Sequence, residues 1–301
     1  MRVEDVRGTL CFNVEGTPEE TDLAKPKYTF VMNEVEGSEL VDRYFLYNDI
    51  LGFGDLVMRE PDRVADLYEI ISTLNAHRHD SFGTIVFSDT ILVYPKFRRN
   101  LGTRSDAYFV MYLCEFAQDL MYRLVSRNIY FRAVLTQGKF THYLLNEIPC
   151  FYGPALVNAF RSEKKIKAVG LFMDNRCLSV SDIFKTCPFN EEYSFVYLSQ
   201  SLDEFAPQGS ALYPIPFPDA ALFRDMDLEW ALAQDVLMLK NISESRTSSD
   251  SGIREKHNNT WQLLHSRYGF IMDELERNDF HPRVICPGLD WTESMKRAQS
   301  E

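Results

Sequence analysis

Residues 43–54 read RYFLYNDILGFG, and this stretch decides how the chain is organised. The six residues 43–48 are mostly aromatic and apolar, which predicts a short strand. Asp49 follows that strand, and Gly52 and Gly54 then form a turn before a helical pattern begins. A carboxylate at a strand end can hold a hard divalent cation, with phosphate oxygens completing the coordination shell. An aspartate that only starts the turn is the competing interpretation.

The segments after this stretch alternate between helices and strands. Helices are predicted where apolar residues recur at helical spacing, over residues 61–77 and 105–125, and where a proline opens the pattern, over 154–167. Strands are predicted at residues 83–94 with a bend at Ser88-Asp89, and at 129–135, 139–145 and 168–173. The 105–125 helix is apolar around most of its circumference, which favours burial in part by a second subunit.

This order predicts an α+β domain with appendages at both ends. We expect a loosely structured lead-in over residues 1–40, with one strand near 28–32, and the main domain over 41–187. A mostly helical extension over 188–301 should contain helices around 220–239 and 259–275. The serine-rich stretch 243–251 (SESRTSSDS) is expected to be a flexible connection between them.

Composition excludes several classes of function. The 301 residues contain 32 Lys and Arg against 44 Asp and Glu, a net charge of −12, which argues against broad nucleic-acid binding. No apolar run is long enough for a secretory signal or a membrane span, so we expect a cytoplasmic protein without membrane insertion. Six scattered cysteines without CxxC spacing suit free thiols.

A second carboxylate supports the interpretation of Asp49 as a ligand of a divalent cation. Asp89 falls at the predicted hairpin bend, where it can lie beside the end of the first strand. Two carboxylates that hold two divalent ions are suited to phosphoryl chemistry. On spacing alone, Asp49 as a turn residue and Asp89 as a bend residue remain an open alternative.

Three motifs together resemble a known family. The first is DILGF at 49–53, the second is Ser88-Asp89 at the bend between two strands, and the third is FYGPAL at 151–156, which opens a helix that reaches Glu163. Their order and spacing resemble those of the class III nucleotide cyclases. The wording of DILGF and FYGPAL looks like the bacterial anti-phage Pycsar pyrimidine cyclases. The resemblance covers about residues 42–174 and implies a ferredoxin-like cyclase domain, with an antiparallel-rich sheet flanked by helices.

The resemblance also implies roles for individual residues. It assigns two Mn²⁺ or Mg²⁺ ions to Asp49, the main-chain carbonyl of Ile50, and Asp89. Arg161, eight residues after Gly153, matches a catalytic arginine that would offset charge at the α-phosphate. A helix-surface arginine is the alternative for this position. Main-chain N–H groups around Gly52 and Phe53 are expected to contact phosphate.

Departures from the purine cyclases point to a pyrimidine substrate. Cys150 and Val157 stand where purine cyclases have a base-selecting polar residue and a catalytic asparagine, and Asn158 comes one position late. Residues 83–87 also lack the purine-reading lysine. Purine recognition is therefore disfavoured.

Base contacts are sought on the first strand. Arg43, Tyr47 and Asp49 share one face by strand alternation, and Tyr44 points to the other. We expect Arg43 and Tyr47, with Tyr44 as the alternative, to supply contacts near the base, although packing in the core is open for either tyrosine. Arg132, alone in an apolar strand, is either an end-of-strand cation or a substrate contact.

These observations predict a uridylate cyclase that converts UTP to 3′,5′-cyclic UMP and pyrophosphate. Hydrogen-bond donors, with no carboxylate to receive an amino group, favour UTP over CTP. A cytidylate cyclase making cyclic CMP, a purine cyclase and a catalytically inactive nucleotide-binding homologue remain alternatives. The resemblance further implies a homodimer with shared sites, and a product that acts in anti-phage defence on a separate cyclic-nucleotide-binding effector.

Overall fold

The computed structural model describes residues 37–74, 77, 79–99, 104–205 and 213–300; most of the 1–40 lead-in, including the strand expected near 28–32, lies outside this set. The strands are β1 (Val41–Ile50), β2 (Phe82–Phe87), β3 (Thr90–Pro95), β4 (Phe131–Leu145), β5 (Ile148–Tyr152), β6 (Gly170–Asp174), β7 (Thr186–Pro188) and β8 (Tyr193–Val196). The α-helices are α1 (Phe53–Arg59), α2 (Pro61–Thr73), α3 (Arg104–Val125), α4 (Pro154–Glu163), α5 (Ala220–Asp225), α6 (Leu228–Ser245), α7 (Ser251–Arg277) and α8 (Thr292–Ser300).

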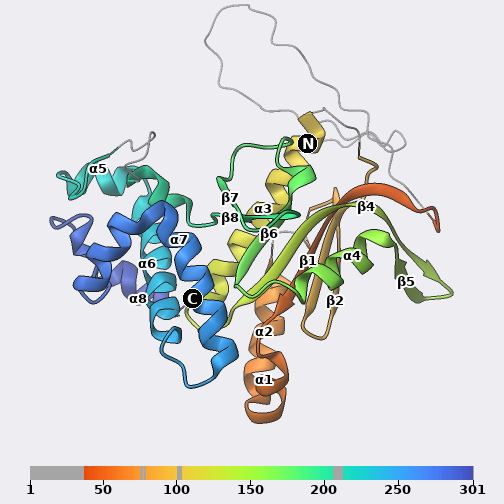
Figure 1. Cartoon of the computed structure of the whole chain (residues 1–301), viewed down its shortest axis with the longest axis horizontal. Coiled ribbons are helices and arrows are strands. Elements are labelled where there is room, and N and C mark those ends of the chain that lie inside the picture. Colours follow the sequence, from red (N-terminus) through yellow and green to blue (C-terminus); the bar gives the residue numbers. More distant parts are fainter. Residues whose placement is uncertain (1–36, 75–76, 78, 100–103, 206–212, 301) are drawn as a thin grey trace, which may run out of the picture.

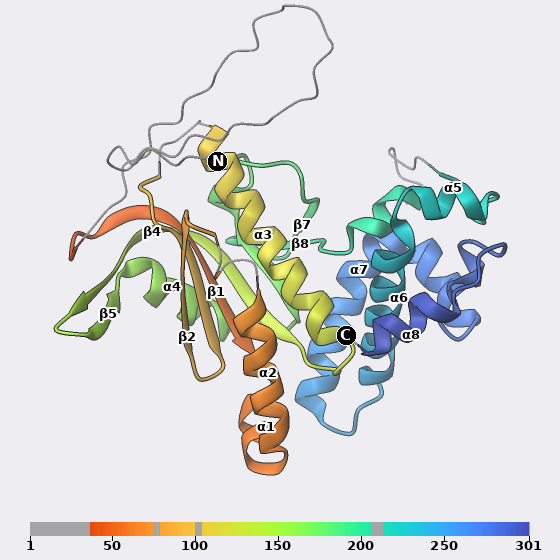
Figure 2. The same ribbon diagram turned by 180° about the vertical axis from the view of Figure 1, so that it is seen from behind.

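One sheet organises these elements. Its strand order is β2-β3-β1-β4-β6-β8-β7, with β5 paired to β4 outside this path. Strands β4 and β6 run parallel, and the other pairings that the structure describes are antiparallel. Helix α4 lies on one face of the sheet (Figure 1), and α3 crosses the opposite face (Figure 2). The expected α+β fold, with an antiparallel-rich sheet flanked by helices, is confirmed.

Side-chain alternation along β1 separates the two faces of the core. Tyr44 and Leu46 pack among the residues on the α3 side. Phe45 and Tyr47 pack among those on the α4 side. The prediction that Tyr44 and Tyr47 point to opposite faces is therefore confirmed.

Some predicted elements differ from those observed. The strands expected at 129–135 and 139–145 are one strand, β4, because β1 pairs with it continuously from Phe131 to Phe140. Beyond Phe140 the same strand pairs only with β5, and the two form an arm that projects from the sheet (Figure 1). The helix expected over 220–239 is two helices, α5 and α6, because Asp227 adopts a left-handed conformation between them.

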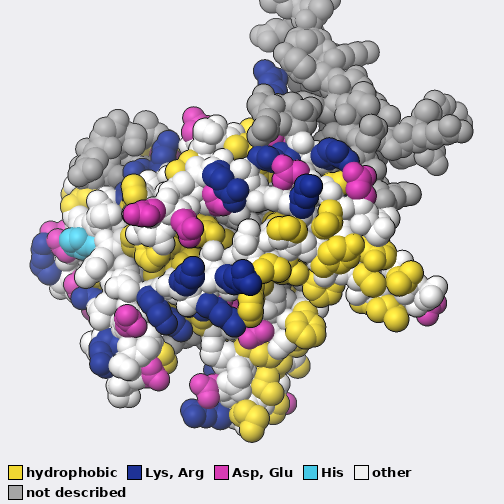
Figure 3. All heavy atoms as spheres, turned by 45° about the vertical axis from the view of Figure 1, so that its right-hand side comes forward, with side chains coloured by type: hydrophobic (Ala, Val, Ile, Leu, Met, Phe, Trp, Pro, Cys, Tyr) yellow, Lys and Arg dark blue, Asp and Glu magenta, His cyan; other side chains and the backbone are white. Residues whose placement is uncertain are grey.

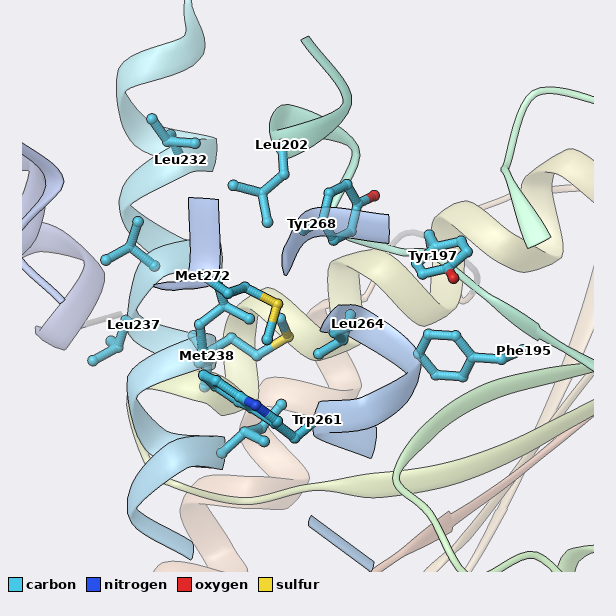
Figure 4. Packing of buried hydrophobic residues seen from close by; sticks show 14 of the residues in the cluster. Phe195, Tyr197, Leu202, Leu232, Leu237, Met238, Trp261, Leu264, Tyr268 and Met272 are labelled. Carbon is cyan, nitrogen blue, oxygen red and sulfur yellow. The ribbon is translucent and has the colours of Figure 1, made fainter. Parts of the chain in front are cut away.

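The C-terminal extension shares the core of the sheet, which corrects the domain boundary after residue 187. That boundary falls inside β7, and β8 beyond it is still part of the sheet. Phe195 and Tyr197 pack with residues of α6 and α7, among them Leu264 and Tyr268, in one buried cluster (Figure 4). The chain therefore has no separable tail at this point.

The extension also covers helix α3. Tyr122 donates to Asp235 of α6 over 3.5 Å, and the Asn241 amide donates to the Val125 carbonyl oxygen over 2.8 Å. The apolar circumference of α3 is thus buried within the chain, and burial by a partner is not needed to explain it.

The 243–251 stretch forms the corner between α6 and α7, and its expected flexibility stays a prediction. Its first three residues end α6 and its last residue begins α7. Asp250 accepts hydrogen bonds from the main-chain N–H groups of Gly252 and Ile253, so it caps α7. Ser243 donates to Glu276. Polar side chains of a kind common in linkers here cap helix α7 and bind Glu276.

Candidate active site

Strand pairing brings the two aspartates together at the end of β1. Asp49 lies opposite Thr90 of β3 and opposite Arg132 of β4. The main-chain N–H of Ile50 donates to the carbonyl oxygen of Asp89 over 2.9 Å. Asp89 therefore occupies the β2–β3 turn beside Asp49, where the sequence predicted it.

The electrostatics of Asp49 indicate a site short of positive charge. Burial, and after it the nearby charge of Asp89, raise the pKa of Asp49 to about 6. Arg132, Lys256 and Lys164 act in the opposite direction. The two carboxylates thus repel each other in a partly buried position, which a bound cation would relieve.

Arg132 is held beside Asp49 by a buried ion pair. Its Nη2 lies 3.8 Å from Asp49 Oδ2, and the same guanidinium pairs with Glu163 at the end of α4. Its Nη1 donates to the Ile166 carbonyl oxygen over 2.7 Å. Arg132 is therefore a paired cation near the start of β4, and its contact with a substrate stays a prediction. Its pairing with Glu163 could not be predicted, because a glutamate at the end of a helix gives no sign of the residue that it contacts.

The loop after Asp49 turns at a glycine. Gly52 has φ of 75°, in the left-handed region where glycine is favoured, and the main-chain N–H of Leu51 donates to the Tyr130 carbonyl oxygen over 2.9 Å. Phe53 is buried, with its ring edge-on to that of Tyr68. The Phe53 side chain therefore anchors α1 in the core. The phosphate contact expected from its main-chain N–H stays a prediction.

A cleft of about 630 Å³ opens beside this loop. Its walls come from the β1–α1 loop with α1, from the start of α2, from residues 128–130 before β4, and from the α6–α7 corner. Lys256 and His257 of the C-terminal extension line it opposite Leu51 and Gly52. The extension thus reaches the site, which its distance along the sequence did not reveal.

The candidate base-contacting residues are not gathered together. Tyr47 lies on the face of Asp49, and its hydroxyl is 3.4 Å from the Thr90 hydroxyl. Tyr44 is fully buried on the opposite face and donates to Asp106 over 3.1 Å. Arg43 is buried toward the other end of β1, where it donates to the Pro95 carbonyl oxygen over 3.1 Å. Strand geometry therefore corrects the expectation for Arg43 and Tyr44 and retains Tyr47.

Arg161 lies on the exposed side of α4. It lines a different cleft, of about 550 Å³, together with Asn158, Asp174 and Arg176. Gly153 of the FYGPAL motif precedes this helix, and packing explains why it is a glycine. A Cβ at this position would overlap the Lys139 carbonyl oxygen of β4. Within one chain, Arg161 does not share a cleft with the Gly52 loop.

An apolar surface runs along the arm and α4. Its most exposed members are Leu144 and Ile148 of the arm, at 69% and 63% exposure, and Val157 and Phe160 of α4 are also exposed. Figure 3 shows hydrophobic side chains gathered on this side of the molecule, over the arm and next to it. Contiguous exposed apolar patches of this kind mark interaction surfaces.

Burial raises the pKa of the Cys114 and Cys177 thiols, and the five cysteines that the structure describes are all free. In the same part of the chain, no helix has the length and apolar character needed to cross a membrane.

Comparisons with known proteins give only distant structural similarity. No family model matches the sequence, and no curated protein matches it. The chain is similar to the dimeric guanylyl cyclase domain of the RhoGC fusion protein from the aquatic fungus Blastocladiella emersonii, with 17% identity over 54% of this chain and 98% of that one, at a TM-score of 0.42. It is also similar to the adenylyl cyclase CyaB from P. aeruginosa, with 12% identity over 53% and 96% of the two chains, at a TM-score of 0.38.

A third similar structure is a class III adenylyl cyclase-like ATP-binding protein from Pseudomonas aeruginosa. Its identity is 13% over 48% of this chain and 35% of that one, at a TM-score of 0.33. These three similar structures are thus a guanylyl cyclase domain, an adenylyl cyclase and a cyclase-like ATP-binding protein. Similarity this distant does not bear on activity, so the function proposed below rests on the residues at the end of β1.

Proposed function

We propose that the chain is a divalent-metal-dependent nucleotide cyclase that acts on a pyrimidine nucleoside triphosphate, with UTP as the preferred substrate. The observation that carries the proposal is the placement of Asp49 and Asp89 side by side at the end of β1, fixed by the Ile50 to Asp89 hydrogen bond and next to a cleft that begins at Gly52. Two carboxylates beside the loop that borders this cleft suit phosphoryl transfer from a bound triphosphate.

The donor set fits hard divalent ions. Asp49 and Asp89 offer carboxylate oxygens, the Ile50 main chain offers a carbonyl oxygen, and Mg²⁺ and Mn²⁺ prefer such ligands together with substrate phosphates. Among the described residues no group of three or more His, Cys, Asp or Glu side chains is placed to hold a metal, so substrate oxygens and water would complete the shell. Two bound ions would make the ribose 3′-hydroxyl more acidic and offset triphosphate charge.

Other residues of the chain hold the Asp49 carboxylate and its strand in position. Arg132, fixed by Glu163, keeps a positive charge 3.8 Å from Asp49 and holds that carboxylate at the mouth of the site. On the α4 side of the strand the buried Tyr47 ring meets the ring of Phe160 edge-on. A triphosphate bound beside Gly52 would thus meet a preorganised and partly desolvated set of charges.

We place Arg161 in the site of a second copy of the chain. Each copy exposes apolar residues on its arm and on α4, and Arg161 lies on the same helix. A homodimer that buries this surface would bring α4 of one subunit toward the partner's aspartates. Arg161 would then stabilise charge at the α-phosphate there.

A mixing experiment tests the shared site. Asp49→Ala and Arg161→Ala subunits, each inactive alone, should regain activity when mixed, because one heterodimer site keeps both groups. Absence of rescue in confirmed heterodimers would rule out the shared arrangement, while leaving metal-dependent cyclisation itself open to the substrate assay below.

The base preference rests on fewer residues than the sequence suggested. Cys150 lies on β5 of the arm and offers no carboxylate for an amino group, and β2 lacks a lysine. Tyr47 remains the hydroxyl donor nearest Asp49 on its strand. We therefore keep UTP ahead of CTP, with product selectivity carried by Tyr47 and by residues of the partner subunit.

The direct test is an equimolar mixture of the four nucleoside triphosphates with Mn²⁺ and purified protein. Cyclic UMP with pyrophosphate is the expected product, and Asp49→Ala should abolish it while Asp66→Asn, on the exposed side of α2, should not. Turnover close to wild type in Asp49→Ala would remove the basis of the proposal. Loss of selectivity in Tyr47→Phe would support the role of its hydroxyl.

Three other outcomes of the same assay identify the alternatives. Cyclic CMP as the main product would identify a cytidylate cyclase, and cyclic AMP or cyclic GMP a purine cyclase. Nucleotide binding without turnover would identify an inactive homologue, an alternative that Val157 favours because it stands where a catalytic asparagine is expected.

The proposal extends to signalling. A cyclic pyrimidine nucleotide is a diffusible product that a separate cyclic-nucleotide-binding effector can recognise, as the Pycsar-like motifs DILGF and FYGPAL imply for anti-phage defence. Accumulation of cyclic UMP in cells that express the chain, and its absence with Asp89→Ala, would be the first measurement of such a role.

A further inference from the structure

The C-terminal extension places one basic side chain in the cleft next to the aspartates. Lys256 belongs to α7, is half-buried, and lines the cleft opposite Leu51 and Gly52. It forms no ion pair within 4.0 Å with any residue that the structure describes. An unpaired, half-buried ammonium is costly unless an anion approaches it.

Two contacts with the segment that leads into β6 fix the direction of this side chain. Thr260, one helical turn after Lys256, accepts a hydrogen bond from the Val169 main-chain N–H over 2.8 Å, and Asn259 donates to the Lys167 carbonyl oxygen over 2.6 Å. Residues four apart lie on the same side of a helix, so docking of Thr260 turns Lys256 toward the sheet. The position of Lys256 is thus set by packing.

The ion pairs around the cleft leave one of its cations without a partner among the described residues. Lys256 lies close enough to Asp49 for each to influence the other's pKa, and Arg132 and Lys167 add positive charge next to it. Arg59 and Arg63 on the opposite wall are already paired with Asp55 and Glu60. Asp250, also in the wall, is engaged as the cap of α7. Lys256 is the wall cation that these pairings leave available among the described residues.

We propose that Lys256 binds the β- and γ-phosphates of the substrate, so that the C-terminal extension completes the active site in the same chain that supplies Asp49 and Asp89. This inference rests on the proposed function for the identity of the substrate, but its core is the binding of a polyphosphate. A lysine ammonium is a compact point charge with three donors, which suits non-bridging phosphate oxygens. The extension is then a catalytic part of the enzyme and not only a cover for the sheet.

The test uses the full chain and inorganic tripolyphosphate in a magnesium-containing buffer, with binding measured by calorimetry. Lys256→Gln should weaken binding about tenfold, and Lys256→Arg should restore it to within about threefold of wild type. Lys240→Gln on α6, whose partner Asp279 is exposed, is the matched control and should bind like wild type. In the cyclase assay, Lys256→Gln should lower kcat/KM for the nucleotide by about tenfold or more, because the β- and γ-phosphates leave as pyrophosphate and gain negative charge in the transition state.

The outcomes separate this proposal from the cyclase assignment. Equal tripolyphosphate affinity in wild type and Lys256→Gln, or no affinity in wild type, would overturn the role of Lys256 whether or not a nucleotide is cyclised. Lys256-dependent binding without any cyclic product would uphold the polyphosphate site and overturn the cyclase. Both lysine variants are checked by thermal unfolding against wild type, and Lys256→Arg keeps the test valid if Lys256→Gln is destabilised.

Discussion

The buried pair between Arg132 and Glu163 gives a quantitative prediction for stability. Only 9% and 3% of the two side chains are exposed. Removing one member of a buried pair leaves an uncompensated charge and costs about 3–5 kcal/mol. Glu163→Gln should fall near the lower limit, about 3 kcal/mol, because Arg132 keeps Asp49 at 3.8 Å and the Ile166 carbonyl.

Arg132→Met should reach the upper limit, about 5 kcal/mol, because it leaves two carboxylates without their cation. The double replacement Arg132→Met with Glu163→Leu should cost less than Arg132→Met alone, since it removes a buried charge and adds apolar contacts. Recovery should be incomplete, because Asp49 still lacks Arg132.

Thermal and urea unfolding of the full chain measure these differences. At about 2–4 °C per kcal/mol for a chain of this size, Glu163→Gln should lower Tm by roughly 6–12 °C. Glu274→Gln, which breaks an exposed pair with Arg277 on α7, is the control and should change the free energy of unfolding by less than about 1 kcal/mol. Costs below about 1 kcal/mol for both single variants, or a double variant as unstable as the sum of the two, would refute the reasoning.

Three further predictions concern titration and assembly. Asp235 is fully buried, and desolvation raises its pKa to about 7, so the folded state holds its proton more tightly than the unfolded state and its contribution to stability falls as pH rises from about 4 to 7. Asp235→Asn should therefore be more stable than wild type by roughly 2–4 kcal/mol at pH 8 and by little at pH 4. A difference in urea unfolding that does not change with pH would contradict this. With a pKa of about 6, Asp49 changes from roughly one-tenth to nine-tenths ionised between pH 5 and 7, so Mn²⁺ affinity measured by calorimetry should rise about tenfold, and equal affinity at both values would argue against Asp49 as a ligand. Charging the arm with Leu144→Asp and Ile148→Asp should convert dimers to monomers in analytical ultracentrifugation with Tm unchanged, because both side chains are exposed within one chain; persistence of the dimer would place its interface elsewhere.

The pairing of Asp49 with Asp89 was predictable because it depends on local geometry. A strand, a turn and a hairpin are visible in the sequence as alternation and bend residues, and the bend of a hairpin next to a strand end can be located without knowing the rest of the fold. The same periodicity assigned Tyr44 and Tyr47 to opposite faces. It could not show that Tyr44 is sealed against α3, because burial depends on what packs on each face.

Contacts between distant segments were not predictable. Lys256 enters the cleft because Thr260 binds Val169, and neither residue type signals such docking. The helix pattern over 105–125 showed how much surface had to be buried but not that α6, instead of a partner, buries it. Likewise, the serine-rich 243–251 stretch has the composition of a linker, and only Asp250 as a cap and Ser243 beside Glu276 show it to be a corner.

Strand β4 extends unbroken through 15 residues, about 50 Å at 3.3 Å per residue. Arg132 lies near its first residue, where the strand is hydrogen-bonded into the sheet, and Leu144 lies near its last, out on the arm. The surface that the arm offers to a second copy and the guanidinium beside Asp49 are thus the two ends of one strand. A single run of 15 residues supplies both an expected dimer contact and a charge next to the aspartates.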